Sequence, residues 1–219
     1  MKTGLLGGTF NPPHLAHLRI AEEAREACGL DRVLFIPAAD PPHKPVEGDV
    51  PFAERCRMVE RAIAGNSGFE LCAIEGERSG KSYSIDTITE LQARRPEDRL
   101  FFIIGSDSFL EIGTWHDYPR IFSSCSLIVA ERPGMPVSDP LHALPVVIRD
   151  QFSYTAASRE LHHVSGTTVH FITGCLLEIS SSRVRELAAA GRSLRYLVPP
   201  EVEAYITEQR IYTPCRKNR

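Results

Sequence analysis

The stretch from Gly7 to Leu18, GGTFNPPHLAHL, constrains the fold of this chain more than any other. It follows an apolar run from Thr3 to Leu6 that predicts a buried strand. It leads into residues 15–28, where apolar residues recur at steps of three or four, as in a helix. Two glycines at the end of the strand permit a tight turn. The segment therefore predicts a strand, a glycine turn and a helix N-terminus, whose free N–H groups form an anion site.

Two histidines, His14 and His17, fall in the first turn of that helix. Residues three apart share one face of a helix, so both imidazoles point the same way beside the free N–H groups. Converging donors of this kind suit a phosphate that gains negative charge during a reaction. A metal pair or two surface histidines are the alternatives. The metal alternative is weak because the stretch supplies no third ligand.

A second candidate anion site lies far along the chain. Ser180, Ser181 and Ser182 precede a predicted helix, and Arg185 falls one turn inside it. Serines at a helix start are usually caps. Their hydroxyls, the free amides and the guanidinium also suit a polyphosphate. The two segments together fit a nucleoside triphosphate held between two helix starts, and the lack of G-x-x-x-x-G-K-[ST] excludes a P-loop protein.

The hydrophobic pattern of the whole chain predicts an α/β protein. A strand at residues 32–37 follows the first helix, and strand, helix and strand within about forty residues form the βαβ unit of a parallel sheet. Further strands are predicted at residues 69–74, 100–104, 126–130 and 168–173, and helices at 52–64 and after Ser84, Gly105, Ser182 and Pro199. We expect a Rossmann-like, doubly wound parallel sheet of about five to six strands.

One domain accounts for the whole length. We expect it to span residues 1–219, with the Rossmann-like core at 1–175 and a small C-terminal helical part at 176–219. Residues 131–145 hold four prolines and a glycine and predict a linker or an excursion from the fold. Residues 146–148 look extended.

Composition excludes several classes of protein. A net charge of −3 gives no general attraction to nucleic acid or an acidic membrane, and no apolar run approaches the length of a membrane span. Six scattered cysteines without a C-x-x-C pair favour free thiols in a reducing cytoplasm. The sequence leaves open whether the chain forms a homo-oligomer.

Three loops at the expected carboxyl ends of strands are further candidates, because open α/β sheets bind ligands at that edge. Lys44, in a proline-rich loop, could meet a phosphate. Asp107, just after Gly105, could hold ribose hydroxyls or simply cap a helix. Trp115, the only tryptophan, is either a core residue or a platform for a flat ring. Ser84 fits the N-cap of a helix.

These segments resemble the nucleotidyltransferase superfamily. Residues 7–17 resemble its GGTFDPxHxGH signature, with Asn11 in place of Asp and Ala16 in place of Gly, and residues 179–185 resemble ISSTxxR. The middle of the chain narrows the resemblance. Its matching segments are SYSIDT at 82–87, GSDSF and TW between 105 and 115, PPHK at 41–44 and RYLVP at 195–199. With them the chain resembles the bacterial nicotinate-nucleotide adenylyltransferase family along nearly its whole length.

The resemblance implies a transferase of NAD biosynthesis that moves AMP from ATP to nicotinate mononucleotide, by direct in-line displacement at the α-phosphate. Deamido-NAD and pyrophosphate are then the products. An acceptor such as nicotinamide mononucleotide or another phosphomonoester is the alternative, and a nucleotide-binding regulator without turnover is a more remote one. We expect Mg²⁺ to bridge the phosphates and to be held mainly by the substrates, because the sequence offers no cluster of carboxylates and hence no protein metal site.

The resemblance also implies a role for each candidate residue. His14, His17 and Arg185 are the expected catalytic residues, which neutralise charge and align the phosphates. The expected ATP-binding residues are these three together with Gly7, Gly8, Thr9, Phe10, Gly105, Asp107, Ser180, Ser181 and Ser182. The expected nicotinate mononucleotide-binding residues are Lys44, Tyr83, Ser84, Trp115 and His116. Among them Trp115 would stack on the pyridine ring, and backbone amides near Tyr83 and His116 would receive its carboxylate.

Overall fold

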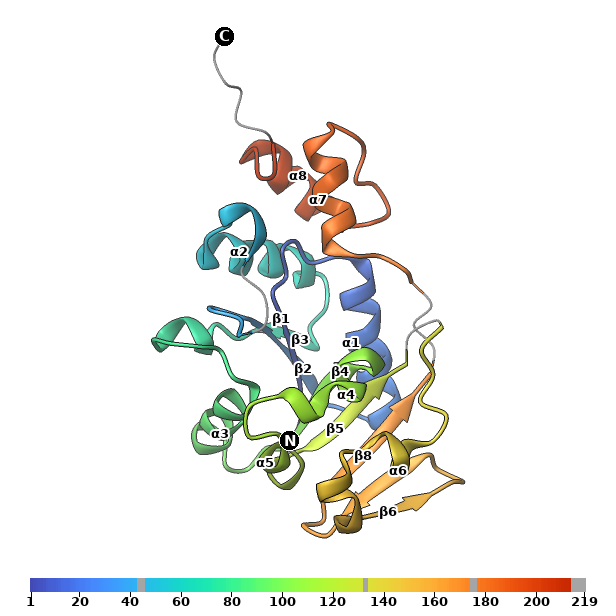
Figure 1. The fold of residues 1–219 in the computed structure, drawn as a ribbon. Coiled ribbons are helices and arrows are strands. Elements are labelled where there is room, and N and C mark those ends of the chain that lie inside the picture. The colour runs from blue at the N-terminus through green and yellow to red at the C-terminus, as the bar shows by residue number, and fades with distance from the viewer. Residues whose placement is uncertain (43–45, 132–133, 174–176, 214–219) are drawn as a thin grey trace.

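The chain folds around a mostly parallel sheet (Figure 1). The computed structural model describes residues 1–42, 46–131, 134–173 and 177–213, and within these the sheet has eight strands in the order β3-β2-β1-β4-β5-β8-β7-β6. The strands are β1 (Lys2–Gly8), β2 (Arg32–Pro37), β3 (Phe69–Leu71), β4 (Arg99–Gly105), β5 (Ser126–Ala130), β6 (Phe152–Thr155), β7 (Glu160–His163) and β8 (Thr168–Ile172). β1 to β5 and β8 run parallel, which confirms the predicted Rossmann-like core, and β6 and β7 are antiparallel. The strand order reverses between β1 and β4, the place where such sheets bind ligands.

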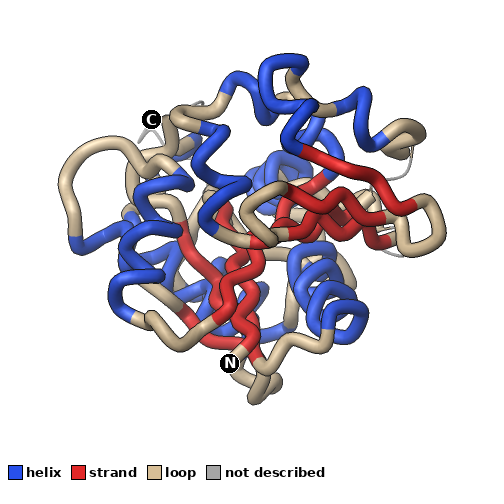
Figure 2. Tube along the Cα trace, turned by 90° about the horizontal axis from the view of Figure 1, so that it is seen from below, coloured by secondary structure: helices blue, strands red, loops and turns tan. Residues whose placement is uncertain are grey.

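Helices cover both faces of this sheet (Figure 2). The α-helices are α1 (Leu15–Cys28), α2 (Phe52–Ile63), α3 (Ser84–Arg94), α4 (Ser106–Leu110), α5 (Tyr118–Ser124), α6 (Pro140–Ala143), α7 (Ser181–Ala189) and α8 (Pro200–Glu208). Short 3-10 helices are η1 (Glu47–Asp49), η2 (Ile74–Glu77), η3 (Ile112–Thr114) and η4 (Val146–Gln151). Among the described residues, no helix is both long and apolar enough to cross a membrane.

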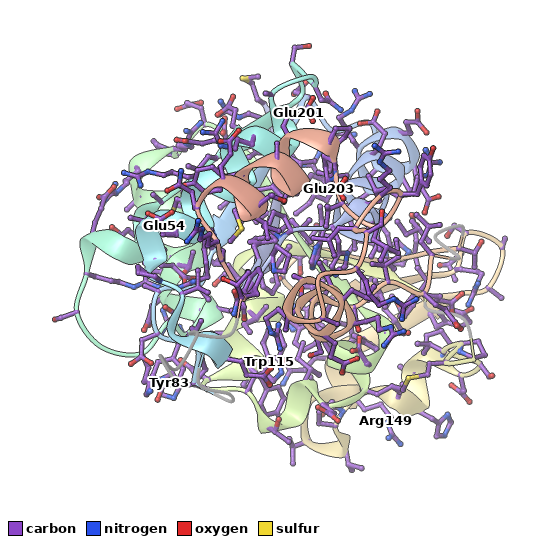
Figure 3. The ribbon with its side chains drawn as sticks, turned by 90° about the horizontal axis from the view of Figure 1, so that it is seen from above. Glu54, Tyr83, Trp115, Arg149, Glu201 and Glu203 are labelled. Atoms are coloured by element: carbon purple, nitrogen blue, oxygen red, sulfur yellow. The ribbon has the colours of Figure 1, made fainter. Side chains whose placement is uncertain are left out.

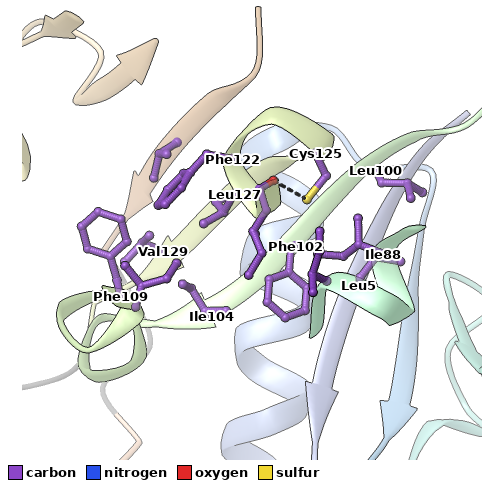
Figure 4. Packing of buried hydrophobic residues seen from close by; sticks show 14 of the residues in the cluster. Leu5, Ile88, Leu100, Phe102, Ile104, Phe109, Phe122, Cys125, Leu127 and Val129 are labelled. Carbon is purple, nitrogen blue, oxygen red and sulfur yellow. Dashed lines mark hydrogen bonds between the residues drawn. The ribbon is translucent and has the colours of Figure 1, made fainter. Parts of the chain in front are cut away.

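Two buried clusters lie on opposite faces of the sheet. Leu6 belongs to the cluster under α1 and α2, together with Val59. Leu5, the next residue back, belongs to the cluster under α3, α4 and α5, together with Ile88 and Phe109 (Figure 4). Successive strand residues point to opposite faces, so a continuous apolar run is buried on both sides.

A third buried cluster attaches α7 and α8 to α2, at the top of Figure 1. Met58 of α2 lies in it with Val184 of α7 and Val202 of α8. The Tyr205 hydroxyl also donates to the Glu54 carboxylate of α2 at 2.5 Å. The position of α7 over the start of α1 therefore depends on α2. The predicted division at 175/176 falls outside the described residues and stays a prediction.

Several local predictions differ from the structure. The strand predicted at residues 69–74 ends at Leu71. The sheet is larger than five to six strands because residues 152–163 add the hairpin of β6 and β7; three of the four residues of β6 are exposed, so no apolar alternation marked it. Residues 146–148 start the 3-10 helix η4 instead of a strand, since only Ile148 of the three is buried. The N-cap of α3 is Tyr83, one residue before the predicted Ser84.

Candidate active site

One cavity of about 670 Å³ brings the two predicted anion segments together. His14 and His17 line it from the start of α1, and Arg185 lines it from α7. Thr9, Phe10, Ser180, Ser181 and Ser182 also lie in its wall. The volume falls in the usual range for small-molecule sites, about 300–1,000 Å³. The cavity opens where β1 ends, at the edge of the sheet that the sequence predicted.

The two imidazoles are stacked on each other. Their centroids lie 3.6 Å apart with an interplanar angle of 22°, and the ring of Phe10 meets His17 edge-on at 5.0 Å. The backbone N–H of His14 donates to Nδ1 of His17 at 3.2 Å. An N–H can only donate, so Nδ1 must be the unprotonated nitrogen, and neutral His17 carries its proton on Nε2. This hydrogen bond sets Nε2 of His17 as a donor.

Side chains of the second segment bind the first segment directly. Ser181 Oγ donates to the carbonyl of Pro12 at 2.9 Å, and Arg185 Nη1 donates to the carbonyl of Asn11 at 2.8 Å. Arg185 Nη2 donates to Ser182 Oγ at 3.1 Å. The carbonyl oxygens of the loop before α1 are thereby occupied by α7. The cavity wall is one hydrogen-bonded unit made from two distant parts of the sequence.

Two carboxylates in the cavity wall are already paired with arginines. Glu47 of η1 forms an ion pair with Arg185. Glu131, which directly follows β5, accepts two hydrogen bonds from Arg159, at 2.9 and 3.1 Å. A polyphosphate that binds Arg185 has to compete with the exposed Glu47 carboxylate.

Two side chains that hydrogen-bond to the loop of residues 9–12 were not predicted from the sequence. Arg55 of α2 is 1% exposed, and its Nη1 donates to the carbonyl of Thr9 at 2.8 Å. The Tyr212 hydroxyl donates to Asn11 Oδ1 at 2.6 Å, and burial raises the pKa of Tyr212. The signal for Arg55 was its spacing, because it lies three residues after Phe52 on the apolar face of its helix. Tyr212 has no comparable signal.

A second, smaller cavity of about 80 Å³ gathers four of the residues predicted to bind nicotinate mononucleotide. Tyr83, Ser84, Trp115 and His116 line it, and Tyr83 and Trp115 are labelled in Figure 3. The rings of Tyr83 and His116 lie 4.3 Å apart. Trp115 also packs edge-on against the buried Phe102 at 6.2 Å, so it belongs to the core as well as to the cavity. The space fits one flat ring rather than a whole nucleotide.

Five predicted residues are not placed in either cavity wall. Gly7 and Gly8 end β1, and Gly105 ends β4 with Asp107 in the short helix α4 that follows. They lie at the correct edge of the sheet, but none lines the two cavities described here. The prediction for Lys44 falls outside the described residues.

The match to a protein family covers most of the chain. The family model for cytidylyltransferase-like proteins matches residues 5–187. A curated relative from Pelobacter propionicus, named "Probable nicotinate-nucleotide adenylyltransferase", is 68% identical and covers 98% of this chain and 100% of the relative. One of the same name from Geobacter metallireducens is 59% identical, over 99% of this chain and 100% of the relative.

Solved structures show the same fold. A nicotinic acid mononucleotide adenylyltransferase of Plasmodium falciparum complexed with NaAD aligns with a TM-score of 0.74 at 18% identity, over 97% of this chain and 98% of that one. The same enzyme complexed with APC aligns with a TM-score of 0.73 at 17% identity, over 96% of each chain.

Proposed function

This chain belongs to the cytidylyltransferase-like family, and on that premise we propose that it is a nicotinate-nucleotide adenylyltransferase. It transfers AMP from ATP to nicotinate mononucleotide and forms deamido-NAD and pyrophosphate. The high identity to relatives of that name, over nearly the whole chain, confirms the family resemblance of the motifs.

One observation supports the residue roles: stacked imidazoles and a guanidinium share a cavity large enough for a nucleotide, and Trp115 lines a separate, ring-sized cavity. The triphosphate of ATP lies against His14, His17 and Arg185. The pyridine ring of the acceptor lies by Trp115. This arrangement directs the phosphate of the acceptor toward the α-phosphate of ATP.

The reaction needs alignment and charge neutralisation more than a strong base. The attacking oxygen belongs to the phosphate of nicotinate mononucleotide, whose second pKa is about 6, so it is already deprotonated at neutral pH. It forms the new bond to the α-phosphorus while the bond to the leaving pyrophosphate breaks. Nε2 of His17 donates to the phosphate oxygens, on which charge accumulates, and the N-terminus of α1 adds its partial positive charge.

The donor set supports a Mg²⁺ ion that binds together with the triphosphate. The described residues hold no group of three histidine, cysteine or carboxylate side chains placed to ligate a metal. Glu47 and Glu131 of the cavity wall are both paired with arginines. Phosphate oxygens would supply most of the ligands, and bound Mg²⁺ would neutralise their charge.

A cytoplasmic location is also proposed. The described cysteines Cys28, Cys56, Cys72 and Cys125 are free thiols. Burial raises the pKa of Cys28 to about 11, which keeps it protonated and unreactive. Buried free thiols are typical of a reducing compartment.

Pyrophosphate release from ATP tests the function. Nicotinate mononucleotide should start the release, and nicotinamide mononucleotide and a simple phosphomonoester should give much lower kcat/KM. An equal kcat/KM with nicotinamide mononucleotide would contradict the preference for nicotinate mononucleotide. ATP binding without release in the presence of any of the three would indicate a regulator.

A further inference from the structure

We propose that Arg55 is a positioning residue for ATP, which holds the loop at residues 9–11 from behind and places a buried positive charge beneath the phosphate cavity. This inference rests on the proposed function. Arg55 does not line the cavity itself and acts through the loop, so it is not a catalytic residue.

The partners of Arg55 are unusual for a buried charge. Its side chain is 1% exposed, yet its described contacts are the carbonyl of Thr9 and the ring of Phe52, with the guanidinium carbon 5.5 Å from the ring centroid. No described carboxylate is close enough to form an ion pair with it, although the buried Glu75 attracts its charge from further away, and its Nε has no hydrogen-bond partner. Buried charges are almost always paired with an opposite charge. The charge of Arg55 is therefore available to an anion that arrives later.

The contact with Thr9 explains how this charge reaches the site. Thr9 lines the cavity, while its carbonyl oxygen is held by a residue outside the cavity wall. A carbonyl oxygen that faced a phosphate would repel it, whereas backbone N–H groups attract it. The next residue, Phe10, has a φ of 48°, in the left-handed region that non-glycine residues rarely adopt. Arg55 thus helps to hold a loop shape that the chain would not favour by itself.

The guanidinium stays charged in this environment. Burial lowers the pKa of Arg55 from its ordinary value. An arginine nevertheless keeps its proton at neutral pH because its ordinary pKa lies far above that range. Little water screens a charge at this depth, so its attraction for a triphosphate is stronger than at the surface.

Three variants separate positioning from plain structural support. Arg55→Met removes the charge and keeps an apolar chain of similar length, and Arg55→Lys keeps the charge without the planar fork. Arg149→Met is the matched control (Arg149 is labelled in Figure 3). The Arg149 guanidinium likewise binds backbone carbonyls, here two, those of His142 and Leu144, and likewise has a buried Nε without a hydrogen-bond partner, but Arg149 lines neither cavity.

The measurements are KM for each substrate, kcat, and the rise in melting temperature that ATP produces without acceptor. In Arg55→Met we expect KM for ATP to rise about tenfold and the ATP-induced shift to shrink, with KM for nicotinate mononucleotide within about twofold of the native value. Arg55→Lys should fall between Arg55→Met and the native protein. Arg149→Met should change the melting temperature alone.

A folded Arg55→Met with native KM for ATP, an equal rise in both KM values, or the same rise in Arg149→Met would overturn the proposal. If Arg55→Met does not fold, Arg55→Lys decides alone, and a native KM for ATP there overturns it. Native protein without any pyrophosphate release would instead refute the proposed function, while the ATP-induced shift would still test Arg55.

Discussion

The substitution His17→Asn should distinguish the structural role of Nδ1 in this imidazole from the catalytic role of Nε2. In the structure Nδ1 accepts from the backbone N–H of His14, so neutral His17 carries its proton on Nε2, the nitrogen that the proposed function assigns to phosphate. An asparagine oxygen can take the place of Nδ1, but nothing replaces Nε2. His17→Gln does the reverse, because its longer side chain brings an amide N–H near the position of Nε2. His17→Ala removes both.

The expected sizes follow from these contacts. Loss of one preorganised donor costs about a hundred- to a thousandfold in kcat, or about 2.7–4 kcal/mol. His17→Asn and His17→Ala should both show this loss, and His17→Gln should retain more activity. The variants rank differently by free energy of unfolding than by kcat. His17→Ala loses a hydrogen bond, worth about 1 kcal/mol, which His17→Asn keeps; both lose the ring contacts with His14 and Phe10.

Steady-state pyrophosphate release gives kcat, and urea unfolding gives the free energy of unfolding. Circular dichroism of each variant shows that the fold is intact. A His17→Asn enzyme within tenfold of native kcat would refute the assignment of Nε2 as the donor. Equal unfolding free energies for the Asn and Ala variants would show that the hydrogen bond to Nδ1 contributes nothing.

Three further outcomes are expected. Trp115→Ala should raise KM for the pyridine nucleotide about fivefold and leave KM for ATP nearly unchanged, since the lost ring contact is worth about 1 kcal/mol; equal effects on both substrates would remove the stacking role. Tyr212→Phe deletes the 2.6 Å hydrogen bond to Asn11 and should lower the free energy of unfolding by about 1 kcal/mol in urea, so an unchanged midpoint would contradict it. Burial lowers the pKa of His170 from its ordinary 6.5, against the opposing effect of Glu160. Its stability contribution is therefore complete above pH 6.5 and is lost as the pH falls below that value, and His170→Gln should flatten the urea-derived profile between pH 7 and 5. Parallel curves of unfolding free energy against pH for the native protein and the variant would contradict this role of His170.

The parts of the fold that local sequence determines were predicted well. β1, the glycine turn and α1 follow from an apolar run, two glycines and a helical period within thirty residues. Ser180 caps α7 as expected, accepting from the N–H of Arg183 at 3.2 Å. These features depend on residues that are close in sequence, so a local pattern of residues predicts them.

Other features depend on contacts that no local pattern reports. The strands β6 and β7 are short and half-exposed, and they form because β7 pairs with β8. Trp115 left two alternatives open, and the structure places it in the core and in the small cavity together. Arg55 and Tyr212 act through hydrogen bonds to a loop in another part of the chain.

The way Asn11 meets Tyr212, across 201 positions of sequence, has a consequence for biosynthesis. At about 5–20 residues per second, a ribosome needs roughly 10–40 s to travel from one to the other. Arg55 is made early in that interval, but Ser181, Arg185 and Tyr212, which also bind the opening segment, are made only near its end. A nascent chain therefore completes the contacts around the opening segment only after Tyr212 has been synthesised, so this part of the site depends on long-range contacts that form late.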